Sequence, residues 1–157
     1  MAIKDYTLGF VLSKQPYNAS ADFILLLRKK KPVSQKGKHN GIGGSLEKGE
    51  TKEECIVREA KEEANLDTTP EQWKFIGTLY KPKKWRIYVA YAYISNSDLA
   101  KIPQQCEEGE FLLAWTDKLP ENTLTNVRWL VPLIQGHERE GQKDFLITYH
   151  QDEGEEK

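Results

Sequence analysis

The sequence of 157 residues has few of the side chains on which zinc centres and disulfide scaffolds depend, with two cysteines and three histidines. Cys55 and Cys106 form no Cys-x-x-Cys pair and no disulfide framework, which fits a reducing compartment. His39, His137 and His150 lack the spacing of zinc ligands, and no His-Glu-x-x-His motif occurs. A zinc enzyme and a disulfide-rich secreted domain are therefore not expected.

Long apolar runs and a dominant charge are also missing. The longest strongly apolar run, residues 23–27, is too short to span a bilayer, and the N-terminus lacks the apolar core of a signal peptide. Lys and Arg number 23 and Asp and Glu 24, so the net charge of −1 gives no overall attraction to membranes or nucleic acids. We therefore expect a cytoplasmic monomer or homodimer without a membrane partner or a stable nucleic-acid partner.

The length suits one domain, which we place at residues 1–150, with a charged tail at 151–157 that does not fold on its own. Alternating or continuous apolar patterns predict strands at residues 6–12, 22–27, 73–80, 86–94, 111–115 and 143–150. A helix is predicted at 124–134, with a kink or an early stop at Pro132, whose nitrogen cannot donate a hydrogen bond. Strands interleaved with two convincing helices predict a mixed α/β domain.

The other helix lies in the most informative stretch of the chain, residues 43–66. A glycine turn leads into it, because Thr51 and Glu54 make a capping box, and Asn65 stands where a left-handed C-terminal cap falls. The apolar face of this helix consists of Ile56, Val57, Ala60 and Ala64. One side of the helix is thus expected to pack against the core.

Three glutamates, Glu59, Glu62 and Glu63, line the flank of that apolar face. Like charges four residues apart cost a helix about 0.2 to 0.5 kcal/mol, so stability does not explain the pattern. Mg²⁺ prefers oxygen ligands, and proteins usually hold it with one or two carboxylates together with substrate phosphates. The acidic strip therefore predicts half of a metal–phosphate site.

The same stretch resembles the Nudix box, Gly-x5-Glu-x7-Arg-Glu-U-x-Glu-Glu-x-Gly-U, in which U is a bulky aliphatic residue. Gly44, Glu50 and residues 58–66 follow this spacing, and every charged position agrees. Ala60 replaces the bulky aliphatic residue and Asn65 replaces the second glycine. The resemblance, to the MutT-like nucleoside-triphosphate branch, implies a Nudix α/β/α sandwich with a mixed curved sheet between helices.

By this resemblance, the protein cleaves a polyphosphate by attack of water with Mg²⁺, for which Mn²⁺ is the substitute. The implied metal ligands are one backbone carbonyl and a set of carboxylates: Gly43, Glu59, Glu62, Glu63 and Glu108. Glu62 completes the cluster through a second metal or a water, Glu108 acts as base or ligand, and Glu107 and Glu110 compete with Glu108. An ordinary acidic surface loop is the alternative for Glu108. Arg58 is expected to organise the site by pairing with Glu50 and Glu59.

The resemblance also places the substrate's base against Asn40, Asn126 and Trp129. A turn-forming role for Asn40 and a core role for Trp129 are the alternatives. The implied substrate is a nucleoside or deoxynucleoside triphosphate, standard or oxidised, released as monophosphate and pyrophosphate. Two other functions stay open: hydrolysis of a different diphosphate, such as a nucleotide sugar, dinucleoside polyphosphate or RNA cap, and nucleotide sensing without catalysis.

Overall fold

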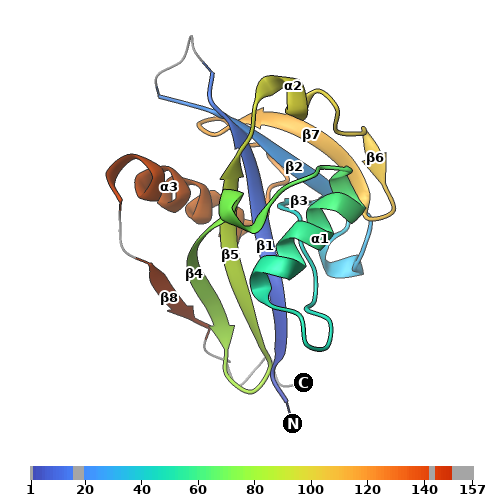
Figure 1. Ribbon diagram of the computed structural model, residues 1–157, viewed down its shortest axis with the longest axis vertical. Helices are drawn as coiled ribbons and strands as arrows, with labels where there is room; N and C mark the ends of the chain where they lie inside the picture. The colour runs from blue at the N-terminus through green and yellow to red at the C-terminus, as the bar shows by residue number, and fades with distance from the viewer. Residues whose placement is uncertain (1, 16–19, 142–143, 150–157) are drawn as a thin grey trace.

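A mixed β-sheet forms the centre of the computed structural model, which describes residues 2–15, 20–141 and 144–149 (Figure 1). Its strands are β1 (Lys4–Ser13), β2 (Phe23–Lys29), β3 (His39–Asn40), β4 (Lys74–Lys81), β5 (Trp85–Tyr93), β6 (Gln105–Cys106), β7 (Gly109–Trp115) and β8 (Phe145–Thr148). Their order is β6-β7-β2-β1-β5-β4-β8, and β3 pairs with β2. The β1–β5 and β4–β8 pairs are parallel and the others antiparallel.

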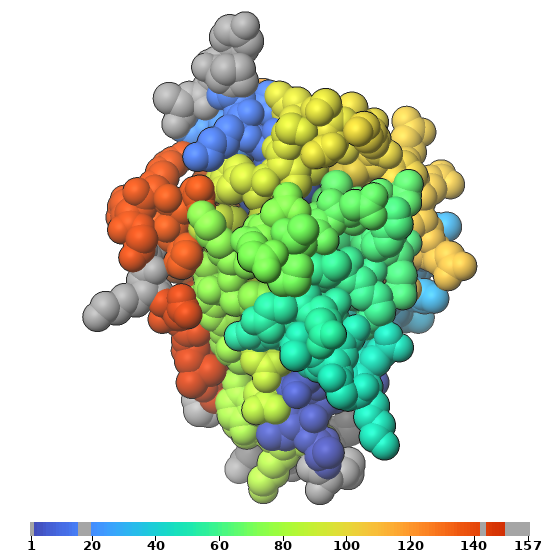
Figure 2. Space-filling view, viewed as in Figure 1, coloured from blue at the N-terminus to red at the C-terminus, as the bar shows by residue number. Residues whose placement is uncertain are grey.

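Alternation along the strands divides the core into two layers. Leu8, Phe10 and Leu12 of β1 belong to a cluster on the side of helix α3 (Thr125–Glu140). Val11 belongs to a second cluster, on the side of helix α1 (Lys52–Ala64). Successive strand residues point to opposite faces, so the two helices cover opposite faces of the sheet. This is the α/β/α sandwich expected from the sequence, and Figure 2 shows the face covered by α1 and the segment after it.

The predicted strands agree with the observed ones to within two residues at each described end. The strands β3 and β6 were not predicted, because two residues are too short to show an alternating pattern. A short helix, α2 (Asn96–Leu99), and two 3₁₀ turns (Val33–Gln35 and Pro70–Gln72) add to the loops. Residues 16–19, which lie between the first two predicted strands, residues 143 and 150 of the expected last strand, and the tail at 151–157 lie outside the described residues.

Of the two outcomes expected at Pro132, a kink or an early stop, the early stop is wrong, because α3 continues to Glu140 and ends at Gly141 with a left-handed φ of 63°. A proline removes only the hydrogen bond of its own nitrogen, and the buried side chains of Val131 and Ile134 hold the helix against the core on either side of it.

No helix in the described ranges is long and apolar enough to cross a membrane.

Candidate active site

Helix α1 begins and ends as its sequence predicts. Thr51 Oγ1 accepts a hydrogen bond from the Glu54 amide at 3.1 Å, and Glu54 Oε1 accepts one from the Thr51 amide at 3.0 Å. Asn65 has a φ of 52°, which is the left-handed conformation of a C-terminal cap. The caps fix the limits of the helix and therefore the rotation of its glutamates relative to the sheet.

The glycine turn before α1 runs along β1. The Thr7 amide donates to the Gly44 carbonyl at 2.9 Å, and the Gly9 amide donates to the Ile42 carbonyl at 2.6 Å. Gly43 has a φ of 143°, and a Cβ there would collide with the Thr7 carbonyl. The turn thus requires glycine at Gly43, because a side chain would push it away from β1.

Gly44 faces Glu59 across a very short gap. A Cβ at Gly44 would lie 2.5 Å from Oε1 of Glu59, so the absence of a side chain makes room for this carboxylate. The Gly43 amide also donates to Oε1 of Glu63 at 3.3 Å. The turn and the helix therefore bring the carboxylates of Glu59 and Glu63 to the same place.

Of the two carboxylates, Glu63 lies in the environment less favourable to a negative charge. Its residue is only 6% exposed, and its Oε2 is buried without a hydrogen-bond partner among the described residues. Burial, followed by the neighbouring Glu59 carboxylate, raises the pKa of Glu63 to about 8. A buried acceptor with no donor costs about 1 to 3 kcal/mol, so this geometry suits a cation that is bound between the two side chains.

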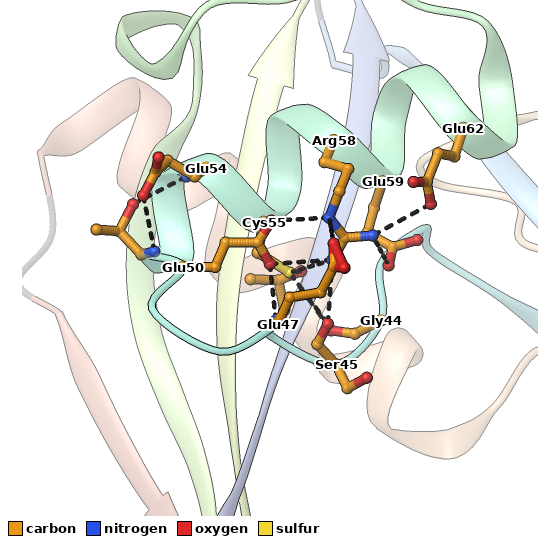
Figure 3. Close-up of polar contacts among 11 residues, drawn as sticks. Gly44, Ser45, Glu47, Glu50, Glu54, Cys55, Arg58, Glu59 and Glu62 are labelled. Atoms are coloured by element: carbon orange, nitrogen blue, oxygen red, sulfur yellow. Dashed lines mark hydrogen bonds and ion pairs between the residues drawn. The ribbon is translucent and has the colours of Figure 1, made fainter.

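Arg58 lies among four carboxylates and holds the other side of the site (Figure 3). Its Nε donates to Glu50 at 2.7 Å, and its Nη1 contacts Glu59 at 3.0 Å and Glu62 at 3.1 Å. Its Nη2 donates to the Ser45 carbonyl at 3.1 Å, which ties the turn to the helix. The expected pairing of Arg58 with Glu50 and Glu59 is confirmed, and it holds the pKa of Glu50 down at about 2.

The three glutamates do not form one continuous solvent-facing strip. Glu63 is buried, whereas the Glu62 side chain is 58% exposed and turned toward Arg58. Across residues 2–15, 20–141 and 144–149, no three His, Cys, Asp or Glu side chains are already gathered about one point as metal ligands. The structure therefore brings Glu59 and Glu63 together and leaves Glu62 at the rim.

Glu108 lies in the turn between β6 and β7, and two lysines flank it. Its carboxylate is 3.5 Å from Lys29 Nζ and 3.8 Å from Lys31 Nζ. The electrostatic effect of Lys29 also reaches Glu63, whose pKa it lowers against the effect of burial. Sequence reasoning missed Lys29, although it lies four residues after Leu25 in β2 and therefore on the same α1 face of the strand.

The predicted base-binding residues occupy separate places. Asn40 Oδ1 accepts from the Gly41 amide at 2.8 Å, which is the turn-forming contact of the alternative interpretation. Trp129 packs half-buried against the core cluster on the α3 face, as its core alternative expected. Asn126 lies half-buried in the first turn of α3. Contacts of these three side chains with a base stay predictions.

A cavity of about 400 Å³ lies on the α3 side of the β2–β7 pair. Its lining combines charged, polar and apolar side chains: Arg28, His39, Glu110, Phe111, Leu112 and Asn122. Within it, His39 is buried, which lowers the pKa of its imidazole. Volumes of this size suit small ligands. Neither His39 nor Asn122 stood out in the sequence, because strand pairing and a distant loop bring them together.

A family model and solved structures show what this chain is similar to. The model of the NUDIX domain matches residues 16–129. A MutT protein from Bacillus halodurans is 19% identical with a TM-score of 0.70, and the match covers 97% of this chain and 92% of that one. A MutT/nudix family protein from Listeria innocua is 18% identical with a TM-score of 0.69, covering 90% and 98%.

A third similar structure, a MutT/nudix family protein from Enterococcus faecalis, is 14% identical with a TM-score of 0.70. The match covers 90% of this chain and 66% of that chain. At identities this low, the likeness to the three structures establishes a shared fold and does not identify a substrate.

Proposed function

This chain belongs to the Nudix family, and from that premise we propose that it is a Mg²⁺-dependent pyrophosphohydrolase of a nucleoside or deoxynucleoside triphosphate. The products would be the nucleoside monophosphate and pyrophosphate. The observation that carries the proposal is the pair of Glu59 and the buried Glu63, which the glycine turn holds together although each raises the energy of the other's charge.

The pair fits a divalent cation. Glu59, Glu63 and the Gly43 carbonyl would hold it, and one of Glu62 and Glu108 would complete the set of ligands. The chemistry that Mg²⁺ supplies when bound is a lower pKa for a coordinated water and neutralisation of charge on phosphate oxygens. A carboxylate that does not hold the ion, Glu62 or Glu108, would accept the proton of the attacking water.

Arg58 positions the other groups and need not touch the substrate. It contacts Glu50 and Glu59 and ties the Ser45 carbonyl to the helix, so the turn and the carboxylates move as one unit. These contacts hold the site in one arrangement before the substrate binds. Such preorganisation matters because a displacement of about 1 Å can lower the rate about 100-fold. The positioning role of Arg58 follows from its contacts, whereas catalysis is assigned to the carboxylates.

The nucleoside part of the substrate has a recess of suitable size in the cavity next to β2. Arg28, in the cavity wall, is the neighbour of Lys29, which contacts Glu108. A phosphate chain at the acidic pair and a base in the cavity would both lie near the C-terminal end of β2. Arg28, Glu110 and Asn122 offer the hydrogen-bond donors and acceptors that a base requires.

A panel of nucleotides separates the proposed function from its alternatives. The protein is incubated with Mg²⁺ and with triphosphates, nucleotide sugars, dinucleoside polyphosphates and capped RNA, and the products are identified. Release of pyrophosphate from triphosphates supports the proposal. Cleavage of diphosphate-linked compounds alone points to the second function, and saturable binding without turnover points to a sensor.

A further inference from the structure

Lys29 is a positively charged side chain that acts on two carboxylates, those of Glu63 and Glu108, which we together call the acidic pocket. It is the last residue of β2, and its side chain is only 13% exposed. Lys31, which contacts the same Glu108 carboxylate from the other side, is 64% exposed. A lysine gives up hydration when it is buried, so its ammonium group stays charged only where carboxylates compensate for the lost water.

A carboxylate from a distant part of the chain provides that compensation at ion-pair distance, and a second carboxylate feels the same charge without a direct contact. Glu108 Oε2 lies 3.5 Å from Lys29 Nζ, and the positive charge of Lys29 acts on Glu63 of α1. Both carboxylates belong to the set proposed to hold the divalent cation. The ammonium group of Lys29 thus stabilises the same negative charges that would attract a metal ion.

The backbone around Glu108 is fixed without the Lys29 side chain. The Lys30 amide donates to the Glu108 carbonyl at 2.8 Å, and Lys29 pairs with Gly109 in the β2–β7 ladder. A Cβ at Gly109 would collide with the Arg28 carbonyl, so the turn lies directly against β2. Because these contacts involve backbone atoms, the lysine side chain is free to change partner while the turn stays in place.

We propose that Lys29 is the counter-ion of the acidic pocket in the metal-free protein and that it couples metal binding to phosphate binding. A divalent cation and the ammonium group repel each other, so the metal binds weakly while Lys29 stays paired with Glu108. A phosphate oxygen gives Lys29 a new anionic partner, and the flexible lysine stem can reach it by rotamer changes.

Coupling of this kind is reciprocal. If phosphate raises the affinity for metal, metal raises the affinity for phosphate by the same factor. The free protein would then bind the cation weakly and hold it tightly only together with a phosphorylated substrate. This inference rests on the proposed function, since it requires the carboxylate pair to be a metal site.

Isothermal titration calorimetry of Mg²⁺ binding tests the proposal in the full chain. Wild type, Lys29→Met and the matched control Lys31→Met are titrated with and without inorganic phosphate, with correction for Mg²⁺–phosphate association measured without protein. We expect Lys29→Met to bind Mg²⁺ alone about tenfold more tightly than wild type and to lose the enhancement by phosphate. Lys31→Met should behave as wild type does in both titrations.

The outcomes distinguish this proposal from the one on which it rests. If wild type binds Mg²⁺ and Lys29→Met has the same affinity and the same response to phosphate, the role of Lys29 is wrong and the metal site stands. Equal effects of the two lysine substitutions would reduce the finding to general surface charge and also overturn it. If wild type binds Mg²⁺ neither in the presence nor in the absence of phosphate, both proposals are overturned.

Circular dichroism and thermal unfolding of each variant show whether it is folded. If Lys29→Met does not fold, Lys29→Gln replaces it, because the amide removes the charge and keeps a hydrogen-bond donor for Glu108. The same affinity changes are expected for Lys29→Gln, and unchanged affinities would overturn the proposal in the same way.

Discussion

The amide of Gly43 donates a 3.3 Å hydrogen bond to Oε1 of Glu63, which joins the glycine turn to the last turn of α1. The other oxygen of this carboxylate is buried without a partner among the described residues. One half of the Glu63 side chain therefore positions the turn, and the other half is available to a ligand. This division would let one buried carboxylate serve both the fold and the proposed metal site.

Replacement of Glu63 by Gln should lower turnover of the substrate by orders of magnitude and leave the helix folded. The amide oxygen can still accept from Gly43, while the negative charge that would hold the metal is lost. Pyrophosphate release and thermal unfolding measure the two effects. Glu53→Gln, in the first turn of the same helix, is the control. Near-normal turnover of Glu63→Gln would remove this residue from the metal site.

Replacement of Gly44 by Ala tests the position of Glu59 without changing any charge. The new methyl group would meet Oε1 of Glu59 at 2.5 Å, so we expect the carboxylate to be displaced and kcat/KM to fall by about 100-fold. Steady-state kinetics and Mg²⁺ titration check this expectation. Wild-type kinetics in Gly44→Ala would mean that the close approach of Gly44 has no part in the reaction.

Glu50 should stabilise the protein in a pH-dependent way. Its ordinary pKa of 4.5 is lowered to about 2, first by the hydrogen bond from Arg58. A lowered pKa gives stability that is complete above pH 4.5 and is lost as the pH falls toward 2. We expect Glu50→Gln to cost about 1 to 3 kcal/mol in free energy of unfolding at pH 6, and progressively less below pH 4.5.

Urea unfolding across this pH range provides the measurement, with Glu47→Gln as the matched control. Glu47 contacts the same Arg58 nitrogen at 2.9 Å but is mostly exposed, so its loss should cost less than 1 kcal/mol, as is usual for exposed pairs (about 0 to 1 kcal/mol). A pH-independent cost for Glu50→Gln would contradict the assigned ion pair.

The two cysteines should differ in reactivity. Burial raises the pKa of Cys55 to about 11, and its thiol lies under the turn near the Gly44 carbonyl, whereas Cys106 is half-buried in β6. Because the thiolate is the reactive form, iodoacetamide at pH 8 should label Cys106 in the folded protein and reach Cys55 only after unfolding. Peptide mass spectrometry identifies the labelled residue. Rapid labelling of Cys55 in the folded state would show that the turn opens readily.

Discrimination among bases tests which of two asparagines, Asn122 or Asn126, contacts the base. If the base lies in the cavity, Asn122→Ala should change the ranking of substrates by about tenfold in relative kcat/KM, more than it changes the maximal rate. The resemblance that led to Asn126 predicts the same effect for Asn126→Ala. Kinetics with several nucleoside triphosphates decide between them, and an unchanged ranking in both variants would place the base elsewhere.

The local sequence was sufficient to predict α1 and both of its caps. Thr51, Glu54 and Asn65 act within one or two turns of the chain, and the spacing of the box glutamates is fixed by the helix itself. Strand alternation likewise gave the sheet segments, because the pleat repeats every two residues. The failure at Pro132 shows the limit of this reasoning, since packing of distant side chains maintained the helix that a local rule would end.

By itself, the sequence determined that three carboxylates and an arginine share one helix next to a glycine turn, which is enough to indicate a metal–phosphate site. Only the tertiary structure decided that Glu63 is buried while Glu62 is exposed, that Lys29 meets Glu108, and that a cavity opens beside β2. The physical reason is that these contacts depend on the pairing of strands far apart in the chain. The register that sets Lys29 opposite Gly109 is fixed by the packing of the whole sheet and has no local signal.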